Sequence, residues 1–267
     1  MKKFLVYLFS FILSLCLVVI VSLMVVKNTV LDRNYVKGLL EKENYYEKLA
    51  VSTKEQMKNY VIQSGFTNEI LDGVYEEEDI KNDVNKLIDQ VYDNEKIYLD
   101  NSKLKENLEK SIVDYLKDKN IKLVSQKEID KFVNMIGDVY TEEVGIVDAL
   151  EPVQTVLNKV FKYFNPVLYG SIGLGLVLAI VIFLLKGRSI FSVPAFTLSF
   201  VYIIVIVLMK NKVDIDNLLI LSKDISSIIK TGYLDIIRTL STISMVSFIS
   251  GIVLSLWSVL RAKVIKN

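Results

Sequence analysis

Residues 4–26 read FLVYLFSFILSLCLVVIVSLMVV, a run of 23 positions without an Asp, Glu, Lys or Arg. A helix needs about 20 apolar residues to cross the hydrocarbon core of a bilayer, where the backbone polar groups must bond to one another. The run therefore predicts a transmembrane helix and makes the chain a membrane protein.

Three later runs have the same character, at residues 167–185, 190–209 and 240–260. The spans divide the chain into three parts, which are an anchor helix at 1–27, a polar domain at 28–166 and a three-span membrane domain at 167–267. This layout predicts a polytopic membrane protein with four transmembrane helices.

The first span also follows a basic start, Lys2 and Lys3, as a signal peptide would. A signal peptide has a shorter apolar region and a cleavage site of small residues, and no such site follows this run. We expect an uncleaved anchor. Cys16 lies inside the span after Leu15, which is not the small residue that precedes a lipidated cysteine, so we expect a buried, inert thiol.

Charged residues beside the spans predict the orientation. The two ends and the short turn after the second span carry seven basic residues and no acidic one: Lys2, Lys3, Lys186, Arg188, Arg261, Lys263 and Lys266. Residues 28–166 carry 19 basic and 27 acidic side chains. Because basic flanks are retained in the cytoplasm, both termini should be cytoplasmic and the polar domain extracytoplasmic, in a plasma membrane.

Apolar residues recur at three- and four-residue steps through the polar domain, which is typical of amphipathic helices. One such stripe includes Met57 and Val61, and another includes Ile129, Phe132 and Ile136. Gly65 is a candidate helix end, and Ser125 with Glu128 has the spacing of a capping box. The fold class is therefore all-α, with four transmembrane helices plus a helical extracytoplasmic bundle.

A further amphipathic helix is predicted at 215–231, between the third and fourth spans. Its apolar face includes Leu218, Leu221 and Ile225, opposite Ser222 and Lys223, and Gly232 would end it. We expect this helix to lie in the outer membrane interface or on the polar domain. A gate over the spans is the alternative.

Small residues form stripes along two spans. We predict a helix-packing role for them, since small side chains let membrane helices approach closely. They are Ser171, Gly175 and Ala179 in the second span and Ser244, Ser247, Gly251 and Ser255 in the fourth. A polar substrate path is the alternative, although no charged residue lies within any span.

No residue pattern points to catalysis, a metal or a cofactor. The chain lacks His, which removes the commonest general base and zinc ligand. Residues 76–79 read Glu-Glu-Glu-Asp and could bind a divalent cation with Asp83. We favour instead a helix start, where negative charge complements the dipole. Nine tyrosines of the polar domain could line a ligand groove or lie at the rim of its core: Tyr35, Tyr45, Tyr46, Tyr60, Tyr75, Tyr92, Tyr98, Tyr115 and Tyr140.

Two resemblances concern the layout. The residues Leu31-Asp32-Arg33-Asn34-Tyr35, Leu39-Leu40 and Tyr45-Tyr46-Glu47-Lys48-Leu49 are similar to a group of uncharacterised bacterial membrane proteins. These share one N-terminal span, a helical extracytoplasmic domain and three later spans, and the resemblance implies no activity. The order of spans also resembles the FtsX-type subunits of ATP-binding-cassette systems, but the expected cytoplasmic segments are too short to hold an ATPase.

Three functions remain open. The first is a non-enzymatic membrane protein that binds a partner or an envelope component through its outer domain, with the lipid bilayer around its spans and no nucleic acid. The second is a component of a transporter or permease complex. The third is an outer-surface enzyme that uses a pair of carboxylates. We favour the first, because nearly all of the mass outside the spans is predicted to be extracytoplasmic.

Overall fold

The computed structural model describes residues 2–121, 125–145, 147–185, 191–212 and 223–264. Within these residues it contains nine α-helices, one short 3₁₀ helix and no strand. The all-α fold class is therefore confirmed. The chain forms two compact units. We call Met1–Tyr35 with Val160–Asn267 the membrane unit, and Val36–Lys159 the polar unit.

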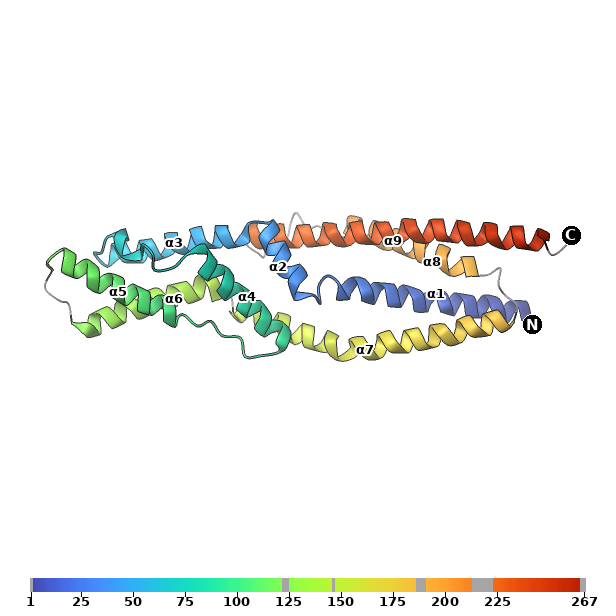
Figure 1. Cartoon of the computed structure of the whole chain (residues 1–267), viewed down its shortest axis with the longest axis horizontal. Coiled ribbons are helices and arrows are strands. Elements are labelled where there is room, and N and C mark those ends of the chain that lie inside the picture. Colours follow the sequence, from blue (N-terminus) through green and yellow to red (C-terminus); the bar gives the residue numbers. More distant parts are fainter. Residues whose placement is uncertain (1, 122–124, 146, 186–190, 213–222, 265–267) are drawn as a thin grey trace. The chain divides into compact units, whose positions relative to one another are not determined.

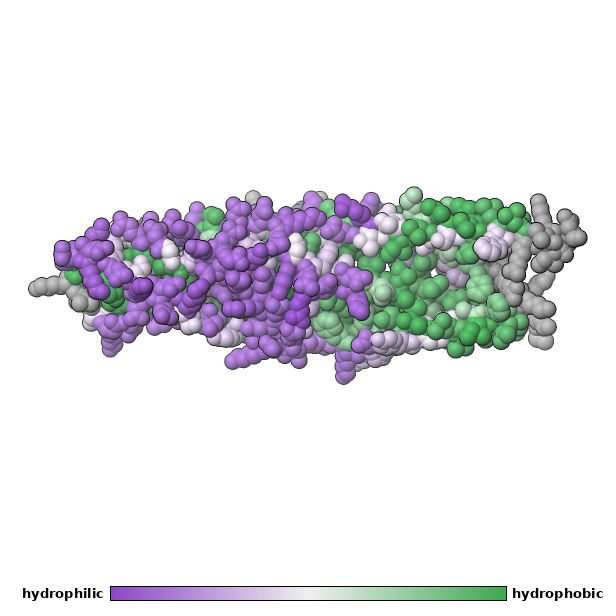
Figure 2. Space-filling view, viewed as in Figure 1, coloured by the Kyte–Doolittle hydropathy of each residue, from purple (hydrophilic) through white to green (hydrophobic). Residues whose placement is uncertain are grey.

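Four long apolar helices dominate the membrane unit (Figure 1). They are α1 (Lys2–Lys27), the part of α7 (Val147–Leu184) from Val160 on, α8 (Ser192–Lys212) and α9 (Lys223–Val264). Each is long and apolar enough to cross a bilayer. Large apolar side chains such as Leu176, Ile204 and Trp257 are exposed along them, and Figure 2 shows the resulting apolar surface. A multi-pass membrane protein is the class that this surface supports.

Interhelical contacts in the membrane unit include both apolar and polar side chains. Leu13 and Cys16 of α1 pack with Leu178 and Ile182 of α7. Tyr202 of α8 is 1% exposed and hydrogen-bonds to Ser22 of α1 over 3.0 Å. A polar contact of this kind gives the two hydroxyl groups hydrogen-bond partners that lipid tails cannot supply.

Two helices continue through residues that commonly interrupt a helix. Gly232 lies inside α9, so the helix end predicted there is wrong. Residues 215–222 of the predicted amphipathic helix lie outside the described residues. Pro166 lies within α7. A proline removes one backbone bond of a helix, and long helices tolerate it with a kink.

Amphipathic helices build the polar unit. They are α2 (Arg33–Lys42), α3 (Tyr45–Gln63), η1 (Asn68–Leu71), α4 (Glu77–Asp93), α5 (Ser102–Asp118) and α6 (Gln126–Gly145). The predicted stripes meet in its core, where Met57, Val61, Ile80, Leu108 and Ile136 are fully buried. Because each helix has only one apolar face, none of them buries its stripe alone.

Local signals place most helix ends of the polar unit. Gly65 has a φ of +82° two residues after the end of α3, a conformation that glycine adopts readily. At the start of α6 the Glu128 carboxylate accepts the Ser125 backbone N–H over 3.0 Å. The Ser125 hydroxyl donates to the same carboxylate over 2.9 Å, and the Glu128 backbone N–H donates to the Ser125 carbonyl, so only the Glu128 half of the predicted capping box is formed.

Candidate ligand-binding pocket

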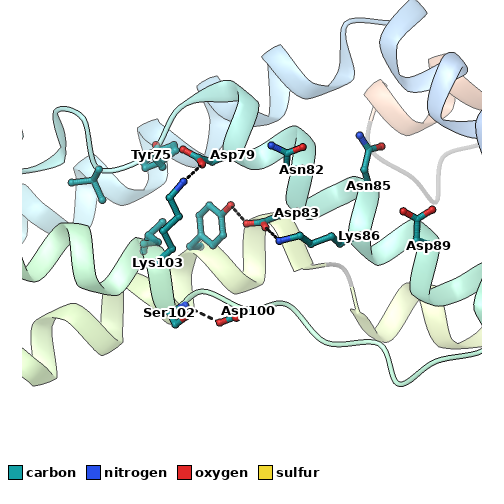
Figure 3. A pocket seen from close by; sticks show the side chains of 13 residues that line it. Tyr75, Asp79, Asn82, Asp83, Asn85, Lys86, Asp89, Asp100, Ser102 and Lys103 are labelled. Carbon is teal, nitrogen blue, oxygen red and sulfur yellow. Dashed lines mark hydrogen bonds and ion pairs between the residues drawn. The ribbon is translucent and has the colours of Figure 1, made fainter.

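A polar pocket of about 450 Å³ opens in the polar unit (Figure 3). One face of α4 forms its longest wall, with Asp79, Asn82, Asp83, Lys86 and Asp89 at three- and four-residue steps. Asn85 of α4 also lines the pocket, and the remaining walls come from other segments, with Val74, Tyr75, Asp100, Ser102, Lys103, Leu104 and Tyr140. The size is that of a small-molecule site.

Side-chain to backbone hydrogen bonds hold each wall in place. The Gln90 amide of α4 bonds both backbone groups of Tyr98, at 3.1 and 2.9 Å, and fixes the segment that leads to Asp100. The Asn101 amide donates to the Gly137 carbonyl of α6 over 2.9 Å. The Asn107 amide of α5 donates to the Val74 carbonyl over 3.1 Å. The pocket is therefore preformed by bonds that do not include a ligand.

Three of the four pocket carboxylates have a basic partner. Lys103 Nζ lies 2.6 Å from Asp79 Oδ1, and Lys37 Nζ lies 2.7 Å from Asp89 Oδ1. Lys86 Nζ lies 3.9 Å from Asp83 Oδ1, at the outer limit for an ion pair. The fourth carboxylate, Asp100, accepts the Ser102 backbone N–H over 3.0 Å. The charges in the pocket are thus largely balanced.

Two tyrosines of the pocket lining contact each other. The Tyr140 hydroxyl donates to Asp83 Oδ2 over 2.7 Å, and Tyr140 is 1% exposed. The Tyr75 ring packs edge-on against Tyr140 with 6.1 Å between the ring centroids. The Tyr75 hydroxyl is buried and makes no hydrogen bond within the described residues. Burial raises the pKa of both phenols, so both stay protonated.

The pKa values of two neighbouring carboxyls of α4 shift in opposite directions. Burial raises the pKa of Asp83, and the Tyr140 hydrogen bond opposes this only in part. The hydrogen bond from Lys103 lowers the pKa of Asp79. Exposure adds to this difference, because the Asp79 side chain is 33% exposed and that of Asp83 only 18%.

The acidic run at 76–79 starts α4. Glu76 precedes the first residue of the helix, and its backbone N–H donates to Asp79 Oδ2 over 3.0 Å. This geometry agrees with the interpretation of the run as a helix start. Within the described ranges no three acidic or cysteine side chains lie close enough to hold a metal ion.

The predicted helix-packing residues lie at contrasting positions in the membrane unit. A Cβ on Gly251 would lie 2.9 Å from the Phe196 ring of α8, and one on Gly175 would lie 3.7 Å from Leu13 of α1. Ser244 is buried and hydrogen-bonds to Ser199 of α8 over 3.2 Å, and Ala179 packs with the cluster of α1 and α7. Ser171, Ser247 and Ser255 are half-buried. The role of these residues stays a prediction, as does their alternative as a substrate path.

Sequence reasoning did not bring the pocket residues together. It named Asp79 and Asp83 for a cation and Tyr75 and Tyr140 for a groove, but on separate grounds. Asp100, Ser102 and Lys103 carried no signal at all, since exposed polar residues at a helix start are common. Only the packing of α4, α5 and α6 places them in one site.

Comparisons with known proteins leave the site without a relative. No protein-family model, no curated protein and no solved structure matches this chain. The resemblance in layout to a group of bacterial membrane proteins therefore stays a prediction, and function has to be argued from the pocket itself.

Proposed function

We propose that the chain is a multi-pass plasma-membrane protein that binds a partner or an envelope component through its polar unit, without catalysing a reaction. In this proposal both termini are cytoplasmic and the polar unit is extracytoplasmic. The observation that carries it is the preformed polar pocket formed by α4, α5, α6 and their connections. Basic span flanks and an acidic polar domain support the orientation.

A binding role agrees with the chemistry of the pocket. Its carboxylates are held by Lys103, by Lys37 and by the Tyr140 hydroxyl, and the chain has no His to act as a general base. Groups that are already hydrogen-bonded within the protein recognise a ligand by replacing some of these bonds with bonds to the ligand.

A transport role has less support. The small residues that suggested a path include Gly251 and Ser244, which lie against Phe196 and Ser199 of the adjacent α8. Close helix packing is the common use of such residues. We therefore keep the binding role as the proposal.

Photo-crosslinking in intact cells tests the binding role. A benzophenone amino acid replaces Asn82, an exposed residue at the pocket, or Asn134, an exposed asparagine of α6 that does not line it. We expect a reproducible adduct from position 82 and none from position 134, found by mass spectrometry of the purified full chain. Equal adducts from both positions, or no adduct from position 82, would contradict a binding site at this pocket.

A further inference from the structure

We infer that the pocket binds a neutral saccharide of one or two sugar rings. This inference deepens the proposed function and rests on it, because it names the chemistry of the envelope component. It starts from three properties of the pocket, which are its charge balance, its hydrogen-bonding groups and its apolar floor.

Charge balance selects against an ionic ligand. The pairs Lys103–Asp79 at 2.6 Å and Lys37–Asp89 at 2.7 Å neutralise two carboxylates, and Lys86 approaches Asp83. An anion would meet the carboxylates, whereas a cation would have to displace lysines that already occupy its place. Desolvating an ion costs several kcal/mol unless a matched charge receives it. A neutral ligand avoids this cost.

The polar groups fit hydroxyls, which both donate and accept. Carboxylate oxygens of Asp79, Asp83 and Asp100 accept, the ammonium groups of Lys86 and Lys103 donate, and the Asn82 amide does both. The side chains of Lys86 and Lys103 are 71% and 74% exposed, so each can donate to a ligand while it stays close to its carboxylate partner. A sugar ring carries several hydroxyls at close spacing and can exchange bonds with donors and acceptors on opposite walls.

The floor of the pocket supplies apolar contacts. Val74, Tyr75, Leu104 and Tyr140 are the apolar part of the lining, and of these four only Tyr75 keeps a partly exposed side chain. The C–H face of a sugar ring packs on an aromatic ring of this kind, while its hydroxyls reach the polar groups of the lining. A volume of about 450 Å³ holds one or two rings.

Ligand binding to the full chain in nanodiscs tests the inference. Purification avoids glucoside and maltoside detergents, and the discs contain no glycolipid, so that no sugar occupies the site. Cellobiose, maltose and N,N′-diacetylchitobiose serve as neutral probes, with spermidine and glucose 6-phosphate as charged ones. Saturation-transfer NMR and calorimetry measure binding. We expect at least one neutral disaccharide to bind and both charged probes to bind at least tenfold more weakly.

Two variants locate the binding. Asn82→Ala should weaken the binding of the disaccharide about fivefold or more, through loss of a hydrogen bond of about 1 kcal/mol, whereas Asn134→Ala should leave the affinity unchanged. Lys103→Met leaves Asp79 without its partner, so spermidine should gain affinity while the disaccharide loses it. A merely structural role for Lys103 would not invert this preference.

Three results would overturn the inference. The first is that no neutral disaccharide binds at 10 mM, roughly the weakest affinity that such small contacts can give. The second is that a charged probe binds the unchanged protein more strongly than any neutral disaccharide does. The third is that Asn82→Ala and Asn134→Ala have equal effects. A protein adduct at position 82 in cells, together with no sugar binding, would keep the proposed function and remove only the saccharide.

Discussion

Asp79 and Asp83 lie one turn apart on α4, yet their surroundings move their pKa values in opposite directions. Lys103 stabilises the Asp79 carboxylate, whereas the half-buried Asp83 depends on the hydroxyl of Tyr140. Because the pKa of Asp83 is raised on folding, its ionised form opposes folding. The stability contribution of Asp83 is present at acidic pH and is lost as the pH rises through the raised pKa.

Removing the donor should therefore have an effect that depends on pH. Tyr140→Phe leaves the Asp83 carboxylate half-buried without its hydrogen bond, and we expect a loss of about 1–3 kcal/mol at pH 7. The loss should shrink as the pH falls through the raised pKa of Asp83 and should be smaller at about pH 4 than at pH 7, because protonated Asp83 carries no charge. Urea unfolding of the full chain in nanodiscs, followed by circular dichroism, measures both values.

Asp83→Asn supplies the control for this prediction. The amide occupies the same place but does not titrate in this range, so Tyr140→Phe in that background should cost the same at pH 7 and pH 4. A pH-dependent loss that persists in the double variant would show that another group is responsible.

At the scale of elements, local patterns in the sequence predicted more than long-range ones. Stripes at helical spacing identified α3 and α6, because an amphipathic helix buries the same face in almost any partner arrangement. Gly232 misled, since the stability of a long helix in the membrane unit outweighs a single unfavourable residue. The pocket could not be predicted, because the residues that face α4 across it come from other segments, and their packing against α4 leaves no local signal in the sequence.

The contact between α8 and α9 gives a prediction for two elements. A methyl group on Gly251 would lie 2.9 Å from the Phe196 ring, which also packs edge-on against Phe248 at 5.7 Å. Gly251→Ala should therefore force these helices apart and cost about 1–3 kcal/mol. The thermal stability of the purified chain in detergent, read by size-exclusion chromatography, measures the change.

Gly173 is a matched control for the same substitution. Nothing lies within 4 Å of a Cβ built there, so Gly173→Ala should leave the stability unchanged or slightly higher. In the Gly251→Ala background, Phe196→Leu removes the ring that the new methyl group meets and should restore part of the loss. If Gly251→Ala and Gly173→Ala behave alike, the close approach of α8 and α9 is not what stabilises the bundle.

For the whole molecule, the separation of charge from apolar surface determines where each unit can reside. The membrane unit exposes large apolar side chains that only lipid solvates favourably, and the polar unit exposes the charged faces of its helices (Figure 2). Folding alone leaves the side of the membrane undecided, because the same helices pack identically in either orientation. The basic residues beside the spans are what favour one of the two.

Cysteine labelling measures the orientation. In a Cys16→Ser background, a membrane-impermeant maleimide applied to intact cells should modify Glu106→Cys, an exposed position of α5, and should spare Gly187→Cys until the membrane is opened. Replacing Lys186 and Arg188 by Gln, with Glu substitutions at Lys2 and Lys3, removes the basic residues of two flanks and should increase the fraction of chains labelled at position 187. Labelling of Gly187→Cys in intact cells with the natural flanks would place the pocket in the cytoplasm, where an extracytoplasmic envelope component could not reach it.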